Sequence, residues 1–144
     1  MSLRIYHTFG PGLNLDDKRI FGSVLKSLLL GSKFEWKSNG AAKRNFLYTK
    51  DLLRAILFTS NLKGFNAFNV AGNSAITISD FVSYARELSS IEIFPHPPDF
   101  LVEASTHIQT GDADISKLNG LGWTPTVEAI DAIRRTRRSM GFKE

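Results

Sequence analysis

Hydrophobic positions along this chain follow two spacings, one typical of strands and one typical of helices. Phe46 and Tyr48 lie two residues apart, which places both side chains on one face of a strand. Ile20, Val24 and Leu28 recur every four residues, as on one face of a helix. These patterns predict strands at 3–9, 34–37, 65–73, 91–94 and around Phe46, and helices at 20–30, 51–60, 78–88 and 126–140.

Several predicted elements have recognisable ends. Gly31 is well placed to end the first helix, because glycine adopts the left-handed conformation of a helix end at little cost. Thr77 with Asp80 three residues later resembles a capping box at the start of a helix. Asn39-Gly40 is a strong turn dipeptide and predicts a tight turn between two strands.

Arg44 lies just before the apolar strand, where its guanidinium can project toward a pocket. The guanidinium is a planar fork that matches a phosphate or a carboxylate. A surface arginine on a hairpin is the other interpretation, and the spacing alone leaves both open. Asp51 then begins an apolar run typical of a helix, whose dipole favours a carboxylate in the first turn.

Composition narrows the class of protein. The 144 residues suffice for one domain with a sizeable core, and the formal charge of +4 suits an anionic ligand without requiring one. The absence of cysteine excludes disulfides and thiolate metal sites. No apolar run is long enough to span a bilayer and no signal-peptide start is present, so a cytoplasmic protein without membrane contact is the simplest expectation.

The stretch from Ser38 to Asp51 resembles the Gly-Asp-Gly-(x)3-Arg-Asp-Phe-x-Tyr-Val-x-Asp segment of extended short-chain dehydrogenase/reductases that act on nucleotide sugars. The resemblance implies that Arg44 binds the substrate diphosphate. Four positions depart from the family pattern and none removes the arginine; they are Ser38, Asn39, Asn45 and Thr49.

Two earlier segments resemble the same family. Residues 4–11 are similar to Arg-Ile-x-Asn-x-Tyr-Gly-Pro, a strand whose end lies beside the nicotinamide and the sugar, which implies that Tyr6 and His7 face them. His7 replaces the usual asparagine, and a buried, hydrogen-bonded histidine is the alternative. The family strand that matches 34–37 lies along the nucleotide base, which implies base contacts for Trp36 or Lys37; burial of the tryptophan in the core is the alternative.

The carboxy-terminal segments continue the resemblance in the same order. Residues 95–99 stand where the family has Arg-Pro-Gly-Asp, whose arginine is a second clamp on the diphosphate. His96 takes that place, and a histidine can act as a charged clamp only when it is protonated. Residues 112–125 resemble the closing Ala-Asp-x-Ser-Lys-(x)n-Leu-Gly-Trp-x-Pro signature.

The parts of the family that perform catalysis are missing. The glycines never fall in the Gly-x-Gly-x-x-Gly order that brings a backbone close to a dinucleotide pyrophosphate. No tyrosine is followed four residues later by a lysine, the pair that supplies the family's acid and base. We therefore expect no catalytic residue in this chain, and NAD bound in the parent protein but not by this chain alone.

The resemblance implies an α/β fold that is the carboxy-terminal portion of a Rossmann-type fold. Residues 1–144 are expected to form the nucleotide-sugar-binding part of an NAD-dependent epimerase/dehydratase, with the amino-terminal NAD-binding part absent. A strand that begins at Leu3 is expected to be a cut rather than a natural beginning. The parent would epimerise, dehydrate or decarboxylate a nucleotide sugar for cell-surface polysaccharide synthesis, and a homo-oligomer is expected because the first strand would expose an apolar edge.

The sequence supports other functions less well. Asp16 and Asp17 are adjacent, but aspartates ahead of a helix usually cap it, and the three histidines lack the short spacing of metal ligands, so no metal is expected. Arginines in the last predicted helix suggest a basic module that binds nucleic acid; their spread over several helix faces favours a solvated surface instead. A structural remnant that binds nothing is the third alternative.

Overall fold

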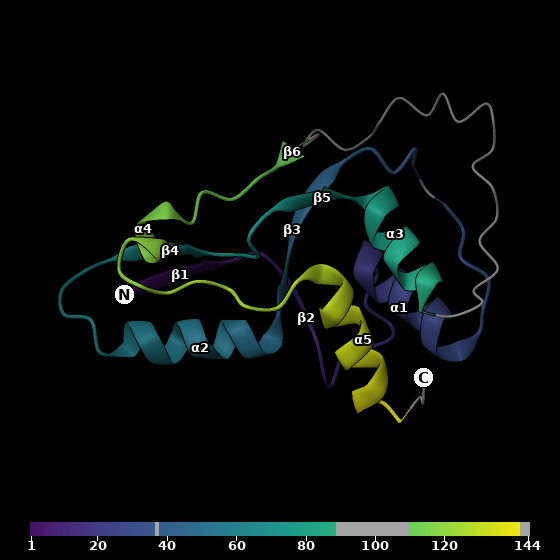
Figure 1. Ribbon diagram of the computed structural model, residues 1–144, viewed down its shortest axis with the longest axis horizontal. Coiled ribbons are helices and arrows are strands. Elements are labelled where there is room, and N and C mark those ends of the chain that lie inside the picture. The colour runs from purple at the N-terminus through teal and green to yellow at the C-terminus, as the bar shows by residue number, and fades with distance from the viewer. Residues whose placement is uncertain (37, 89–109, 142–144) are drawn as a thin grey trace.

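A computed structural model describes residues 1–36, 38–88 and 110–141 (Figure 1). Its strands are β1 (Ser2–Ile5), β2 (His7–Phe9), β3 (Lys43–Tyr48), β4 (Ala67–Val70), β5 (Ala75–Thr77) and β6 (Thr110–Gly111). Its helices are α1 (Ile20–Leu30), α2 (Thr49–Ser60), α3 (Ile78–Glu87), α4 (Ser116–Asn119) and α5 (Ala129–Ser139). The predicted α/β class is confirmed, and the predicted strand at 91–94 lies outside the described residues.

The predicted strand at 3–9 is two strands with different partners. β1 pairs in parallel with β4, from Ser2 opposite Ala67 to Ile5 opposite Val70. After Tyr6 the chain leaves β4, and β2 pairs in parallel with β3, with His7 opposite Phe46. One continuous apolar segment therefore joins two small sheets (Figure 1).

β3 lies at the centre of the fold and presents a different core on each face. Its second half pairs with β2, and its first half pairs with β5 in antiparallel and with β6 in parallel register. Phe46 and Tyr48 enter one apolar cluster, whereas Leu47 enters another, as the alternation of side chains along a strand requires. The period-two spacing of Phe46 and Tyr48 correctly predicted this division.

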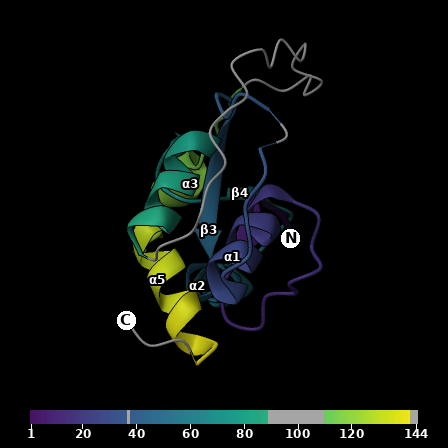
Figure 2. The ribbon, with the colours of Figure 1, turned by 90° about the vertical axis from the view of Figure 1, so that its right-hand side faces the viewer.

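The larger core lies where α1, α3 and α5 meet β2 and β3. Phe21, Leu25 and Phe81 are fully buried in it, and the rings of Phe46 and Phe81 stack with centroids 4.1 Å apart. In Figure 2, α3 and α5 stand one above the other beside β3. Burying a large apolar side chain of this kind stabilises the fold by roughly 1.5–3 kcal/mol, so this face of β3 is a rigid platform.

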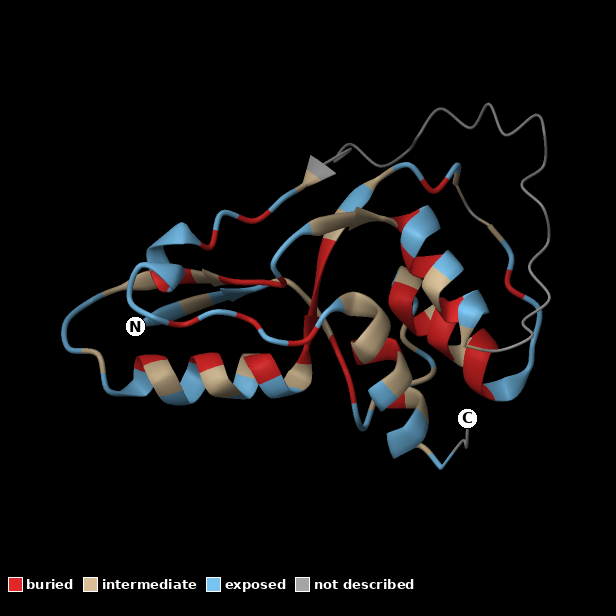
Figure 3. Ribbon diagram, in the orientation of Figure 1, coloured by how far each residue is buried: buried red, intermediate tan, exposed pale blue. Residues whose placement is uncertain are grey.

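The smaller core lies between α2, β4 and the segment at 118–123. Phe68, Leu118 and Trp123 are buried in it together with Ala55 of α2. Figure 3 shows that the buried residues of α2 lie on its side toward β1 and β4, and the opposite side is exposed. We call β1, β4, α2 and α4 together the α2 lobe.

Helix ends follow the local signals closely. The capping box is confirmed, because the Asp80 amide donates to Thr77 Oγ1 at 2.9 Å and the Thr77 amide donates to Asp80 Oδ2 at 3.1 Å. Gly31 ends α1 with a φ of 62°. The last helix is shorter than predicted, since α5 begins only at Ala129.

The predicted hairpin around Asn39-Gly40 is wrong, although Gly40 does adopt a positive φ of 70°. Of the described residues in 32–39, only Phe34 forms a strand bridge, and Glu35 and Trp36 belong to no strand. The turn instead packs on the start of α3, where the Ser79 amide donates to the Gly40 carbonyl at 3.0 Å.

Candidate functional site

Two adjacent parallel strands bring His7 and Arg44 to the same face of the sheet. His7 lies opposite Phe46 in the register of β2 and β3. Arg44 precedes Phe46 by two residues, so it projects from the same face of β3. The His7 ring meets the edges of the Phe21 and Phe46 rings, with centroids 6.3 and 6.0 Å away. The predicted residues His7 and Arg44 therefore belong to one side of the molecule, at the beginning of α1.

Arg19 adds a second guanidinium to this place. It is the residue before α1, and its guanidinium lies 4.5 Å from the centroid of the Phe21 ring. Asp17 orients it, because Arg19 Nε lies 3.0 Å from both carboxylate oxygens and Nη2 lies 2.6 Å from Oδ2. Asp17 also accepts a hydrogen bond from the Arg19 backbone amide at 2.9 Å. This contact replaces the helix cap that the sequence predicts for the aspartates, since α1 has no side-chain cap.

A hollow of about 220 Å³ opens beside these cations, lined by Ile5, Tyr6, His7 and Arg19. His7 and Arg19 are the lining residues whose side chains carry nitrogen. Burial lowers the pKa of His7, and the positive charges of Arg44 and Arg19 lower it further. A neutral imidazole in the field of two arginines is a place where an anion is favoured.

Arg44 is held in place by its neighbours on β3 and β6. Its Nη1 donates to the Lys43 carbonyl at 2.6 Å. Its side chain crosses Gly111, where an added Cβ would lie 3.3 Å from Arg44 Cδ. The arginine is half-buried, so its aliphatic stem is packed and part of its guanidinium reaches solvent.

Asn45, on the opposite face of β3, joins three segments behind Arg44. Its amide nitrogen donates to the Gly72 carbonyl at 3.2 Å, and its Oδ1 accepts from the Ala113 amide at 2.8 Å. The side chain is 1% exposed. Satisfied buried amides of this kind fix strand positions, because breaking them leaves unpaired polar groups. Asn45 therefore sets the position of β3, and with it that of Arg44.

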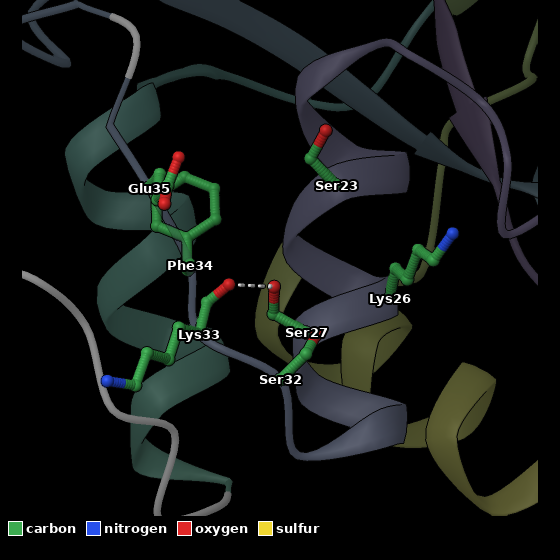
Figure 4. A pocket seen from close by; sticks show the side chains of 7 residues that line it. All are labelled: Ser23, Lys26, Ser27, Ser32, Lys33, Phe34 and Glu35. Carbon is green, nitrogen blue, oxygen red and sulfur yellow. Dashed lines mark hydrogen bonds between the residues drawn. The ribbon is translucent and has the colours of Figure 1, made fainter.

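A second hollow, of about 230 Å³, lies farther along α1 (Figure 4). Three serines, two lysines and one glutamate line it together with the buried Phe34; they are Ser23, Lys26, Ser27, Ser32, Lys33 and Glu35. Ser27 Oγ donates to the Lys33 carbonyl at 3.3 Å and ties the helix to the segment before Trp36.

The other predicted site residues have mixed surroundings. Trp36 is half-buried against the larger core and contacts Phe34 edge-on with centroids 5.3 Å apart, so its packing agrees with the core interpretation. Tyr6 lines the first hollow, but it also packs against the small cluster of Ala71, Ala113 and Ile115. Lys37 and His96 lie outside the described residues.

Within residues 1–36, 38–88 and 110–141, no group of three or more histidine, aspartate or glutamate side chains has the arrangement of a metal site. In the same part of the chain no helix is long and apolar enough to cross a membrane.

Sequence reasoning missed Arg19 and the structural role of Asn45. The Asp17-x-Arg19 spacing was the available signal for Arg19, because a carboxylate two residues away orients the guanidinium. For Asn45 the only signal was a polar residue inside an apolar strand, and its partners lie 27 and 68 residues away.

The sequence is similar to those of a known family and of several curated proteins. The model of the NAD-dependent epimerase/dehydratase family matches residues 1–71. UDP-glucuronic acid decarboxylase 1 of Xenopus tropicalis is 28% identical over 136 residues, which cover 92% of this chain and 31% of that protein. UDP-glucuronic acid decarboxylase 3 of Arabidopsis thaliana is 27% identical over 135 residues, which cover 90% of this chain and 37% of that protein.

Solved structures share the fold. UDP-glucose 4-epimerase from Thermotoga maritima, with UDP-glucose, superposes with a TM-score of 0.81 at 18% identity, over 96% of this chain and 44% of that one. UDP-glucuronic acid 4-epimerase from Bacillus cereus, in complex with UDP-glucuronic acid and NAD, gives a TM-score of 0.78 at 23% identity over the same shares.

The chain thus spans about a third of the length of these curated relatives and less than half of the solved chains. The family match covers β1 to β4. It therefore includes β2, which carries His7, and β3, which carries Arg44. In sequence and in fold this chain is therefore similar to the NAD-dependent epimerase/dehydratase family, of the extended short-chain dehydrogenase/reductases.

Proposed function

We propose that this chain is the nucleotide-sugar-binding part of an NAD-dependent epimerase, dehydratase or decarboxylase. In this proposal Arg44 and Arg19 hold the diphosphate, and His7 and Tyr6 face the sugar. The observation that carries it is a hollow lined by His7 and Arg19, with Arg44 close enough for its positive charge to act on the same imidazole. A guanidinium matches the charge and the planar geometry of phosphate oxygens, and two arginines act on this imidazole.

The shape of the α1 surface supports an elongated ligand. Arg19, Ser23 and Ser27 are spaced by four residues and so follow one face of the helix, from the first hollow to the second. Eight residues of helix extend over about 12 Å. A nucleotide sugar laid along this face would place its diphosphate near Arg19 and its base near the second hollow.

The second hollow offers hydrogen-bonding groups suited to a nucleobase and ribose. Ser23, Ser27 and Glu35 supply donors and acceptors around the buried ring of Phe34. Trp36 and Lys37 follow directly in the sequence, and we propose that they flank the base. His96 remains our proposal for a second diphosphate contact.

We further propose that the parent supplies NAD and the catalytic tyrosine and lysine from a part that packs on the α2 lobe. The outer side of α2 exposes Leu53 and Leu57, and the preceding β1 exposes Ile5, at 55%, 69% and 52%. Strands in parallel sheets normally have both faces covered. Relatives with the same fold are more than twice as long as the matched region, which leaves ample chain for such a part.

Calorimetric titration of the whole chain with UDP-glucuronic acid tests the proposal. Uridine is the control ligand because it lacks the diphosphate, and a single-stranded oligonucleotide tests for nucleic-acid binding. Arg135→Ala is the control variant, since Arg135 is exposed on α5, away from the hollow. We expect UDP-glucuronic acid to bind at least about ten-fold more tightly than uridine, because a charged hydrogen bond contributes about 1.5–3 kcal/mol.

Equal affinity for uridine and UDP-glucuronic acid would show that the chain does not bind the diphosphate, and it would refute the proposed role of the arginines. Oligonucleotide binding that weakens steeply with salt and is reduced by Arg135→Ala would instead favour a nucleic-acid module.

A further inference from the structure

His7 is the titratable group of the first hollow, and three elements surround it. It projects from β2, the ring of Phe46 on β3 lies at its side, and Phe21 of α1 lies against its edge. The side chain is half-buried and lines the hollow directly. A ligand group that enters the hollow therefore meets the imidazole.

The charges that act on His7 come from two of these elements. Arg44 projects from β3 and Arg19 precedes α1, and both are positive at every physiological pH. The Asp17 carboxylate is engaged by the Arg19 guanidinium. In the part of the chain that the structure describes, the charges that act on the imidazole are thus cationic, and they oppose its protonation.

An anionic ligand reverses this balance. Two negative phosphate oxygens beside Arg19 and Arg44 would offset the two positive charges that disfavour the imidazolium. They would also supply acceptors for its N–H groups, because a protonated histidine donates from both ring nitrogens.

We propose that His7 is a proton-coupled anion contact, which takes up one proton from solvent when an anionic ligand enters the hollow. This inference rests on the proposed function and adds to it a direction of pH dependence. It makes His7 selective for ligands of high negative charge, because only these favour the imidazolium. The side-chain amide of an asparagine or glutamine in place of His7 would contact the ligand without taking up a proton.

The direction of the pH dependence follows from the link between proton binding and ligand binding. Burial and the two arginines lower the pKa of His7 in the free protein, so the imidazole is neutral there at neutral pH. The bound anion raises that pKa, so complex formation binds a proton between the two values, and affinity rises as pH falls across this window. Uptake of one proton corresponds to a change of about ten-fold in affinity per pH unit inside the window.

Calorimetry in several buffers measures the proton directly. UDP-glucose is the probe, because its diphosphate is a diester without an ionisation near neutral pH, so the proton comes from the protein side. The titration is repeated at about pH 6.5, near the ordinary pKa of histidine, in bis-Tris, imidazole and Tris buffers. These buffers are cations and do not compete for an anion site. The slope of the observed enthalpy against buffer ionisation enthalpy gives the number of protons taken up.

We expect a slope of clearly more than zero, up to about one proton, in the wild-type chain and a slope near zero in His7→Asn and His7→Gln. The second histidine variant guards against a folding defect in the first, and far-ultraviolet circular dichroism checks both. Arg135→Ala should keep the wild-type slope. A wild-type slope of zero would overturn the inference. The same nonzero slope in the histidine variants would also overturn it and would assign the proton to another group, such as His96 or His107.

The two proposals fail in different ways. Absence of any binding heat with UDP-glucose in wild type, at ligand concentrations up to the millimolar range, refutes the proposed function and this inference with it. Binding that is weakened by Arg44→Ala but shows no proton uptake keeps the proposed function and refutes the role of His7 alone.

Discussion

Replacing Asp51 should lower the free energy of unfolding more than replacing an exposed carboxylate does. Asp51 is fully buried at the start of α2 and accepts four hydrogen bonds. Its Oδ2 accepts from the backbone amides of Thr126 and Val127, both at 2.9 Å. Its Oδ1 accepts from Thr126 Oγ1 at 2.9 Å and from Arg54 Nη1 at 2.8 Å. One carboxylate thus fastens the chain ahead of α5 to α2.

The magnitude follows from what each substitution leaves unpaired. Asp51→Ala leaves the backbone amides of Thr126 and Val127 without their acceptor, whereas the partly exposed Arg54 guanidinium keeps the Thr124 carbonyl and Thr126 Oγ1 as acceptors. Each buried donor left unpaired costs about 1–3 kcal/mol, so we expect a loss of about 2–6 kcal/mol for the two amides. Asp51→Asn keeps the shape and one acceptor oxygen, so we expect a smaller loss, of about 1.5–3 kcal/mol.

Urea unfolding monitored by circular dichroism measures these losses as changes in the free energy of unfolding. Asp131→Asn is the matched control, because its pair with Arg134 is also three residues apart but lies on the surface, where such pairs contribute about 0–1 kcal/mol. A loss below about 1 kcal/mol for Asp51→Ala would refute the reasoning, because so small a loss is typical of a surface pair.

The pH dependence gives an independent check. Burial raises the pKa of Asp51, but the hydrogen bonds from Thr126, Arg54 and Val127 outweigh it and hold the pKa below its ordinary value. This contribution to stability is therefore complete above the unfolded-state pKa of about 4, and it is lost as pH falls through the lower folded-state pKa. The stability difference between wild type and Asp51→Asn should narrow below about pH 4.

Three further predictions concern packing, association and turnover. Gly72→Ala should destabilise the fold by more than about 1 kcal/mol, because its Cβ would lie 2.2 Å from the Phe46 carbonyl oxygen. Gly120→Ala should cost less, because the nearest atom to its Cβ would lie 3.3 Å away. Urea unfolding of both variants measures the two losses. Light scattering should show a dimer or larger species that Leu57→Lys disperses, because the outer side of α2 is apolar and exposed, and a monomer at all concentrations would contradict this. The chain alone should not convert nucleotide sugars in the presence of NAD, and conversion above a boiled control would show that catalysis does not need the Tyr-x-x-x-Lys pair.

Local sequence signals predicted the features that depend on neighbouring residues. The capping box of Thr77 and Asp80, the left-handed end at Gly31 and the alternation in β3 all involve groups within a few residues of one another. Backbone conformation and side-chain direction at such places follow from the residue types themselves.

Features that depend on distant partners were not accessible in this way. Nothing in residues 3–9 shows that the segment changes partner at Tyr6, because the partners in β3 lie 39 positions later and those in β4 lie 65 positions later. The turn at Gly40 predicted a hairpin, but its polar groups are satisfied by the start of α3 instead. Asp51 was expected to interact with the helix dipole, whereas its principal partners lie 75 and 76 residues away.

The candidate site shows the same division. The resemblance named Arg44 and His7, and the strand register brings both to one face. Arg19 joins them only because α1 packs across that face, with Phe21 between the strands and the helix. A spatial group of this kind depends on the crossing of a helix over two strands, which no single motif describes.

The central claim is that Arg44 is a principal contact for the ligand diphosphate, and one series of affinities tests it most directly. Wild type, Arg44→Ala, Arg44→Lys and Lys43→Ala are titrated with UDP-glucuronic acid under one set of conditions, after circular dichroism has verified each fold. Lys43 is the control because its side chain is exposed and projects from the opposite face of β3. We predict a loss of about 10- to 100-fold for Arg44→Ala, a smaller loss for Arg44→Lys, and an affinity within about two-fold of wild type for Lys43→Ala. An Arg44→Ala variant that is folded and binds within about two-fold of wild type would contradict the account.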